Sequence, residues 1–356
     1  MELRDITRID ELSDLVSALT FDEFYQKIVE ENRKYEEEYY EAFKALRLSP
    51  LRGLKRIIFG NWAIFGKIMK LWHLQHNFIY PKEYYQKRPL LWIYDRCRYP
   101  IILDKTSDTR PLFDSAKDIY DNMEQYKAVY ELFEDETSKN VLMGLLVAKL
   151  TGDCRHLTDL TSTNPQYFDG DIIKAYANEV MVDAGGYVGD TAEVLLGMAA
   201  AKGKIKKVYL YEPNEKNMER AKKNLSKSDV EIVFRRAGVS DRRSNVFITS
   251  RDSQSRITDH GQESNKVELV TLDENIKEKI TFIKMDIEGG ERAALRGCQR
   301  HIREDAPKLA ICVYHKPGDV WWLPQYIKSL NPAYRFYLRH HDPLSMSETV
   351  MYCLPR

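Results

Sequence analysis

Glycines and carboxylates stand close together in residues 182–191, which read VDAGGYVGDT. A β-type run precedes this segment, and helix-forming residues follow it from about residue 189. Glycine lets a chain turn tightly after a strand and lets the backbone approach a ligand at the carboxyl edge of a parallel sheet. A plain tight turn is the alternative interpretation. The segment predicts a binding loop for a nucleotide-like cofactor, built from Asp183, Gly185, Gly186, Gly189, Asp190 and Thr191.

The acidic residues of this loop indicate which cofactor it binds. A dinucleotide site would have the pattern G-x-G-x-x-G and would hold a pyrophosphate at the N-terminus of the following helix. Asp183 and Asp190 would repel that pyrophosphate, but they can accept hydrogen bonds from the ammonium group of S-adenosylmethionine. We therefore expect S-adenosylmethionine rather than a nicotinamide dinucleotide.

A third carboxylate, Glu212, ends the next β-type run, YLYEPN, 29 residues after Asp183. In open α/β folds an acid at this point can bind both hydroxyl groups of a ribose. A solvated acid in a turn is the alternative. Because the glycine loop precedes it, Glu212 is the predicted ribose ligand.

Short β-type runs alternate with helical segments from residue 179 onward, and this alternation predicts an α/β fold with a mostly parallel, Rossmann-like sheet. The main runs are residues 179–185, 206–213, 230–238, 279–287 and 309–315. Residues 245–250 and 266–272 predict additional strands in an insertion between the third and fourth main strands. The C-terminal residues 334–354 predict two strands joined by a polar turn, antiparallel at the sheet edge.

Residues 1–164 differ in character, and we expect them to form a mainly helical region in front of a domain of residues 165–356. Thr20-Phe21-Asp22-Glu23 has the pattern of a capping box and predicts the start of a long amphipathic helix. Residues 137–150 predict another helix. We expect this region to serve substrate or partner binding or oligomerisation, and the sequence is compatible with a homo-oligomer.

Charge is unevenly distributed in the first quarter of the chain. Residues 1–43 carry five Lys/Arg against thirteen Asp/Glu, whereas residues 44–88 carry ten Lys/Arg against one Glu. The basic, aromatic residues 52–72 fit a helix that packs on the rest of the protein, and they are also compatible with peripheral membrane contact. The net charge of the whole chain is zero, so we expect no nucleic-acid partner.

Cysteine usage indicates the compartment. The five cysteines are scattered and form no C-x-x-C pair, which argues against a disulfide framework and a structural zinc site. The N-terminal residues are acidic and lack the apolar core of a signal peptide, and no long uncharged apolar run follows. We expect a cytoplasmic protein.

Several strings, in this order, resemble the FkbM family of S-adenosylmethionine-dependent methyltransferases. They are QYFD at 166–169, VDAGGYVGDT at 182–191, YLYEPN at 209–214, VTLDENI at 270–276, FIKMDIEGGERAALRG at 282–297, APKLAICVYHKPGDVWWLP at 306–324, YLRHHDP at 337–343 and ETVMY at 348–352. The resemblance covers about residues 165–356, and a weaker likeness extends back to about residue 130.

The resemblance implies a class I methyltransferase fold, S-adenosylmethionine as cofactor and, most often, methylation of a hydroxyl group on a sugar, glycan or related natural product. It places the cofactor motif on residues 183–191 and the ribose acid on Glu212. The family motif K-x-D-x-E-G falls on Lys284, Asp286, Glu288 and Gly289. Gly186 departs from the commoner alanine, a change that we expect to cost little.

In this architecture Asp286 ends the strand that faces the methyl group, so it is predicted as both a catalytic and a cofactor-binding residue. Glu288 is expected to cap the following helix or to contact substrate. Together with His315, the two carboxylates raise the alternative of a divalent metal ion. We expect no metal, because a hard, oxygen-rich cage needs more ligands than the sequence offers.

His315 ends a strand at the same sheet edge. Its ordinary pKa near 6.5 suits a base that removes the proton of an acceptor hydroxyl group. A structural histidine is the alternative. Arg339 is predicted to clamp a carboxylate or phosphate of the substrate, and the neighbouring His340 is a weaker substrate candidate.

The sequence thus predicts an O-methyltransferase that acts on a small molecule or glycan. A nucleotide-dependent oxidoreductase or epimerase is disfavoured by the missing G-x-G-x-x-G pattern. The other alternative is a non-catalytic methyltransferase-fold scaffold in a glycan-assembly complex. The joint presence of Asp183, Glu212, Asp286 and His315 argues against it.

Overall fold

The computed structural model describes residues 18–47, 110–151, 154–176, 178–202, 205–251, 254–258, 266–343 and 345–356. They belong to two compact units. The first unit comprises the described residues within Met1–Lys127, Asn140–Thr161 and Asp342–Met346, and the second comprises those within Ala128–Lys139, Ser162–His341 and Ser347–Arg356. The basic stretch 52–72 lies outside the described residues.

The first unit is helical. Helix α2 (Phe21–Arg47) begins with the predicted capping box: the Glu23 carboxylate accepts the Thr20 backbone N–H at 2.8 Å, and the Glu23 N–H donates to the Thr20 hydroxyl at 3.3 Å. Helices α6 (Arg110–Asp121), α7 (Met123–Leu132) and α8 (Glu136–Thr151) follow, with the short η3 (Arg155–Leu157). The parts of α7 and α8 within Ala128–Lys139 belong to the second unit. The two helices predicted in this part of the chain are therefore confirmed.

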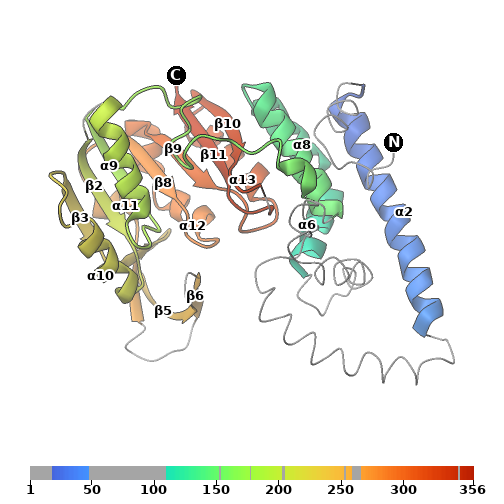
Figure 1. Ribbon diagram of the computed structural model, residues 1–356, viewed down its shortest axis with the longest axis horizontal. Coiled ribbons are helices and arrows are strands. Elements are labelled where there is room, and N and C mark those ends of the chain that lie inside the picture. The colour runs from blue at the N-terminus through green and yellow to red at the C-terminus, as the bar shows by residue number, and fades with distance from the viewer. Residues whose placement is uncertain are drawn as a thin grey trace. The chain divides into compact units, whose positions relative to one another are not determined.

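The second unit is built on a seven-stranded sheet with the order β10-β11-β9-β8-β1-β2-β3 (Figure 1). The strands are β1 (Glu179–Ala184), β2 (Ile205–Tyr211), β3 (Glu231–Arg235), β8 (Phe282–Met285), β9 (Lys308–Cys312), β10 (Tyr334–His340) and β11 (Thr349–Pro355). Every pair from β9 to β3 is parallel, whereas β11 pairs antiparallel with both β9 and β10. The predicted mostly parallel α/β sheet with an antiparallel edge is confirmed.

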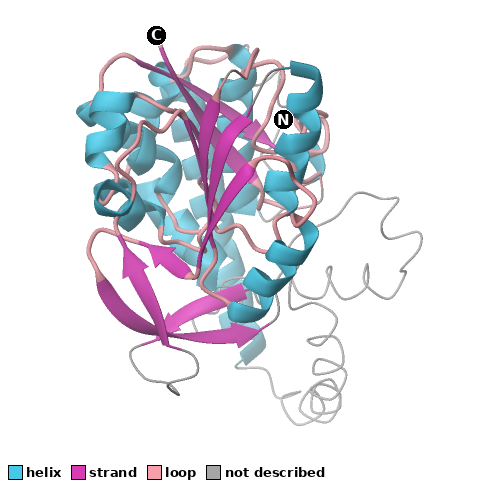
Figure 2. Cartoon of the chain, turned by 90° about the vertical axis from the view of Figure 1, so that its left-hand side faces the viewer, coloured by secondary structure: helices cyan, strands magenta, loops and turns pink. Residues whose placement is uncertain are grey.

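A smaller sheet with the order β4-β7-β5-β6 is inserted between β3 and β8 in the sequence. Its strands are β4 (Ala237–Val239), β5 (Ser244–Arg251), β6 (Gln254–Thr258) and β7 (Lys266–Val270). Figure 2 shows this sheet beside one end of the larger one. Both strands that the sequence predicted here are present, as β5 and β7.

Helices connect the strands of the second unit. They are α9 (Asp190–Lys202), α10 (Glu215–Asn224), α11 (Leu272–Asn275), α12 (Glu291–Arg296), η5 (His301–Asp305) and α13 (Asp319–Leu330). Helix α9 lies against β2 and α10, and α13 lies against β10, β11 and α12. None of the helices within the described ranges is long and apolar enough to cross a membrane.

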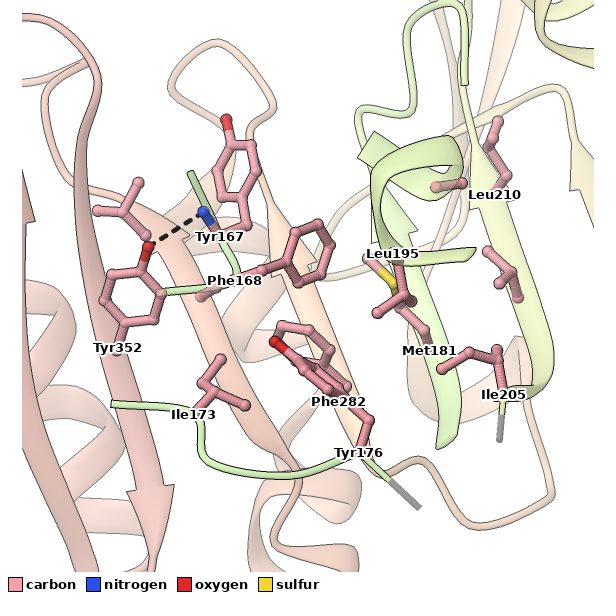
Figure 3. Packing of buried hydrophobic residues seen from close by; sticks show 14 of the residues in the cluster. Tyr167, Phe168, Ile173, Tyr176, Met181, Leu195, Ile205, Leu210, Phe282 and Tyr352 are labelled. Carbon is pink, nitrogen blue, oxygen red and sulfur yellow. Dashed lines mark hydrogen bonds between the residues drawn. The ribbon is translucent and has the colours of Figure 1, made fainter. Parts of the chain in front are cut away.

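One face of the larger sheet carries an apolar core. The segment before β1 contributes several buried side chains to it. Phe168 packs edge-on against Phe282 of β8, with ring centroids 5.7 Å apart, and Tyr176 lies 6.4 Å from the same ring (Figure 3). Met181, Leu195 and other side chains of β1, β2, α9 and α10 complete this cluster. The core therefore fixes the backbone of residues 167–176 against the strands that carry the site.

The order of the strands gives the sheet a topological switch point at its carboxyl edge, between β1 and β8. The chain proceeds from β1 to β2 and β3 on one side, whereas β8 and β9 are added on the other side of β1. Open α/β sheets bind their ligands at such a topological switch point. The loop after β1 and the residues after β8 flank this point.

Candidate functional site

The loop after β1 requires glycine at two positions. Gly185 and Gly189 have φ of 81° and 84°, in the left-handed region that favours glycine. A Cβ atom on Gly185 would lie 1.8 Å from the Asp286 carbonyl oxygen. The N–H groups of Gly185 and Gly186 donate to the Tyr211 carbonyl at 3.0 and 2.9 Å. The loops after β1, β2 and β8 thus meet at this turn.

Gly186 is matched to its neighbour on β2. A Cβ atom here would lie 2.4 Å from Leu210 Cγ. The small cost that we expected for an exchange with alanine therefore applies only if the Leu210 side chain shifts.

Asp183 lies under the loop, fully buried. Its Oδ1 is 3.1 Å from Lys284 Nζ, and the same ammonium group donates to the Gly185 carbonyl at 2.6 Å. Burial would lower the pKa of Lys284, but the carboxylates of Asp183 and Asp286 raise it above its usual range, so Lys284 is charged. Within the described residues, Oδ2 of Asp183 has no hydrogen-bond donor.

Glu212 is fixed at the end of β2 by two backbone donors. Its carboxylate accepts the N–H of Tyr187 at 3.0 Å and the N–H of Asn214 at 2.7 Å. Tyr187 has a φ of 42°, an unusual conformation for a residue with a side chain. Burial raises the pKa of Glu212 to about 7. The carboxylate is thus rigidly held beside the glycine loop, where the sequence placed the ribose ligand.

Asp190 and Thr191 form the first turn of α9 directly after this loop. Asp190 is exposed and Thr191 is partly buried. They lie where the sequence predicted them, at the cofactor side of the edge.

Asp286 follows β8 and faces a group of polar side chains. Its N–H donates to the Ala184 carbonyl at 3.0 Å. Its Oδ2 accepts the Tyr167 hydroxyl at 2.7 Å, whereas its Oδ1 lies 3.5 Å from the Tyr314 hydroxyl and 3.4 Å from His315 Nε2. One carboxylate oxygen is firmly held, and the other faces groups just beyond ordinary hydrogen-bond length.

His315 lies among three carboxylates. Its Nδ1 is 3.0 Å from Oε1 of the fully buried Glu291, and its Nε2 is 3.8 Å from Oε2 of Glu288. Burial lowers the pKa of His315, but Glu291, Asp286 and Glu288 outweigh that effect and raise it to about 9. At this pKa the imidazole is protonated at neutral pH, which does not favour its predicted role as a base.

Glu288 does not cap the helix that follows it. Helix α12 begins at Glu291, and its N-cap is Gly290, which makes no side-chain capping bond. The Glu291 carboxylate accepts the Ile287 N–H at 3.0 Å instead. The capping prediction was wrong because the tight turn after β8, with Glu288 at φ 55°, directs the Glu288 carboxylate toward His315.

Arg339 and His340 have partners inside the protein. The Arg339 guanidinium donates to Asp135 at 2.7 Å and to the Ser138 hydroxyl at 3.0 Å, and His340 Nδ1 lies 2.9 Å from the Thr349 hydroxyl. Both side chains are buried. These contacts hold β10 in place and give no support to the predicted substrate roles.

Other residues of the site carried no role in the sequence analysis. Tyr167, Lys284 and Glu291 appear there only as letters of motifs. Glu348, with a φ of 57°, accepts hydrogen bonds from Gln166 at 2.5 Å and from Tyr314 at 3.2 Å. The charge of Lys284 within a β-type run was the one signal that could have pointed to a buried ion pair.

A metal ion could be held by one group of side chains, Asp286, Glu291 and His315, whose ligand atoms lie within 4.8 Å of one another.

This chain is similar to known proteins in sequence and in structure. Residues 183–342 match the family model of the methyltransferase FkbM domain. The crystal structure of a methyltransferase FkbM from Methylobacillus flagellatus aligns with a TM-score of 0.62 and 25% identity, over 75% of this chain and 71% of that one. A search of curated proteins gave no match.

More distant similarity extends to other solved structures. A putative rRNA methylase from Clostridium thermocellum aligns with a TM-score of 0.36 and 11% identity, over 55% of this chain and 97% of that one. Aeropyrum pernix fibrillarin, solved with natively bound S-adenosyl-L-methionine, aligns with a TM-score of 0.34 and 14% identity, over 52% and 70%.

Proposed function

This chain carries an S-adenosylmethionine-dependent methyltransferase domain of the FkbM type, and we propose that it methylates a hydroxyl group of a sugar, a glycan or a related natural product. The observation that carries the proposal is the construction of the sheet edge. The glycine turn at residues 185–189 and the fixed Glu212 carboxylate lie on one side of the switch point, and Asp286 lies on the other.

The residues of this edge fit the cofactor. A Cβ atom at Gly185 would overlap the Asp286 backbone, so the turn leaves the backbone bare for close approach of a ligand. The fixed Glu212 carboxylate can accept hydrogen bonds from ribose hydroxyl groups. The exposed Asp190 suits the ammonium group of S-adenosylmethionine better than a pyrophosphate, whereas Asp183 is buried and paired with Lys284. When bound, this cofactor supplies an electrophilic methyl group on a sulfonium.

Asp286 would orient the acceptor. Its Oδ2 is held by Tyr167, whereas its Oδ1 faces the Tyr314 hydroxyl and His315 Nε2 at 3.5 and 3.4 Å. An acceptor hydroxyl group placed among these atoms would donate its hydrogen to Asp286 Oδ1. Alignment of the acceptor oxygen with the methyl group and sulfur can supply several kcal/mol of rate enhancement. The predicted role of His315 as a base would require the imidazole to lose its proton first.

Other parts of the proposal concern the surroundings of the enzyme. The described cysteines are buried, and Cys298, Cys312 and Cys353 are free thiols, in keeping with the cytoplasmic location that we propose. We also propose that no nucleic acid takes part. The helical region would serve the acceptor or a partner, through a homo-oligomer or through peripheral membrane contact of residues 52–72.

Calorimetry with S-adenosylmethionine and S-adenosylhomocysteine tests the proposal. Wild type should bind with micromolar affinity, on the order of −8 kcal/mol. Glu212→Ala should abolish binding, and Glu219→Ala, an exposed acid of α10 that pairs only with Lys222 among its described ion pairs, should leave it unchanged. If wild type binds neither compound, the enzyme proposal is overturned and the scaffold alternative takes its place. Binding should be followed by a screen of glycan acceptors for methyl transfer.

A further inference from the structure

We propose that Asp286, Glu288 and His315 form a binding site for a divalent transition-metal ion on the acceptor side of the sheet edge. The sequence analysis expected no metal, because the ligands for a hard, oxygen-rich cage could not be named. The structure adds the geometry and the supporting contacts of a site with fewer protein ligands. The binding inference depends on these donors alone and does not rest on the proposed function.

Two carboxylate oxygens face one nitrogen of the His315 ring. Asp286 Oδ1 and Glu288 Oε2 lie 3.4 and 3.8 Å from His315 Nε2, beyond ordinary hydrogen bonds. Two ligand atoms bound at about 2.1 Å stand about 3.0 Å apart at a right angle and about 3.4 Å apart at the tetrahedral angle. The first separation already fits a shared ion. The second fits after a movement of a few tenths of an ångström by Glu288, whose side chain is 41% exposed.

The two nitrogens of the His315 ring face different carboxylates. A ligating imidazole usually donates its other N–H to a carboxylate, which fixes the ring and its tautomer. Here His315 Nδ1 lies 3.0 Å from Glu291 Oε1, and Glu291 is itself fully buried and accepts the Ile287 N–H. This approach is an ion-pair contact without the geometry of a hydrogen bond, and it leaves Nε2 as the nitrogen that faces Asp286 and Glu288. The His315 side chain is only 9% exposed, so few other orientations are open to it.

The positions of Asp286 and Glu288 are also fixed by their surroundings. Asp286 Oδ2 accepts the Tyr167 hydroxyl at 2.7 Å, which turns Oδ1 toward His315. Glu288 keeps a left-handed backbone conformation with φ 55°, next to Gly289 at φ 91°. Such a conformation is strained in a residue with a side chain and is typical of functional sites.

The donor set indicates the class of metal. One imidazole and two carboxylates suit Mn²⁺, Co²⁺ or Zn²⁺ better than Ca²⁺, which takes six to eight oxygen ligands. Catalytic sites commonly use three protein ligands and leave a position for water or substrate. The Asp286 side chain is 25% exposed, so an ion can enter from solvent. Under the proposed function, a bound ion would polarise the acceptor hydroxyl group.

Metal titration of the full chain, without any cofactor, tests the site. After removal of metals with a chelator, Mn²⁺ should bind to wild type with a stoichiometry of one, measured as loss of the free Mn²⁺ signal in electron paramagnetic resonance. Asp286→Asn and His315→Gln should abolish binding. Glu288→Gln, which changes an exposed side chain and should fold normally, should weaken it at least tenfold. Glu219→Gln, which changes an exposed acid of α10 paired with Lys222, is the matched control.

The supporting contacts provide a second measurement. Tyr167→Phe and Glu291→Gln should each weaken Mn²⁺ binding by about 10- to 100-fold, as outer-shell changes do. Tyr176→Phe removes a hydroxyl group that has no hydrogen-bond partner within the described residues and should change nothing. The proposal is overturned if wild type does not bind Mn²⁺ or Co²⁺, or if Glu288→Gln binds as wild type does. Either result leaves the cofactor calorimetry, and with it the methyl-transfer proposal, unaffected.

Discussion

Glu212 is a carboxylate whose burial raises its pKa to about 7, from an ordinary value of 4.5. It therefore takes up a proton as the pH falls through 7, well above the range of a solvated glutamate. Only the ionised form offers charge-strengthened acceptors to ribose hydroxyl groups. The affinity for the cofactor is thus coupled to pH at this single residue.

We expect the affinity for S-adenosylhomocysteine to be constant above pH 8 and to fall by about tenfold for each pH unit below 7. Glu212→Gln should bind more weakly and should lose this pH dependence between pH 5 and 8. Calorimetry at several pH values measures both effects. A wild-type affinity that stays level down to pH 5 would contradict the assignment of Glu212.

The buried ion pair of Lys284 and Asp183 gives a prediction about stability. Lys284→Met should lower the free energy of unfolding by about 3–5 kcal/mol, because it leaves the Asp183 carboxylate buried without a compensating charge. The double variant with Asp183→Asn should recover part of that loss. Urea denaturation measures the differences. Lys222→Met, which removes an exposed pair with Glu219, should change stability by less than about 1 kcal/mol.

At the scale of elements, the turn from β1 into α9 determines whether the proposed cofactor site at residues 185–191 can form. Gly185→Ala should abolish binding of S-adenosylhomocysteine, because the new Cβ would lie 1.8 Å from the Asp286 carbonyl oxygen at a φ of 81°. Gly197→Ala is the matched control. Gly197 lies within α9 with open space around it, so that change should leave binding intact and stabilise the protein by about 0.5–1 kcal/mol. Calorimetry and thermal denaturation compare the two variants.

The elements were largely predictable from the sequence, because each strand of the larger sheet leaves a local signal. Runs of β-type residues followed by Gly or acidic residues located β1, β2 and β8, and the alternating pattern of residues 334–354 located β10 and β11. The capping box at Thr20 located the start of α2. Such signals depend on residues a few positions apart, so they survive without knowledge of tertiary contacts.

The roles of side chains were less predictable, because they depend on residues distant in sequence. The residues near Arg339 do not predict its contact with Asp135, 204 residues earlier. The residues near Asp286 likewise do not predict its hydrogen bond with Tyr167. The capping prediction for Glu288 was wrong for the same reason, since the turn after β8 directs its carboxylate toward His315, which follows a different strand, β9. Its predicted contact with substrate stays a prediction. Local sequence patterns therefore predict which sheet edge carries the site. They do not predict which side chains contact one another there, because those contacts join residues distant in sequence.

At the scale of the molecule, the two units should respond differently to the cofactor. A ligand that binds only the folded state stabilises it by about 2.7 kcal/mol at 100 times its dissociation constant. With S-adenosylhomocysteine at that concentration, amide hydrogen exchange should slow in β1, β2 and α9 and should remain unchanged in α2 and α6. Mass spectrometry of exchanged peptides measures this. Equal protection in α2 would show that the two units open together.

The hydrogen bond that anchors Tyr167 also determines when the site can be completed during synthesis of the chain. The Tyr167 N–H is held by the Tyr352 hydroxyl, 185 residues later, so at about 5–20 residues per second the ribosome needs about 10–40 s to deliver its partner. A nascent chain that has emerged as far as β9 already contains the glycine loop, Glu212 and Asp286. It lacks the strand that fixes Tyr167, and hence Asp286. A chain whose synthesis ends before β11 would therefore contain every residue of the glycine loop and Glu212. It would lack the contact that positions Tyr167 and Asp286.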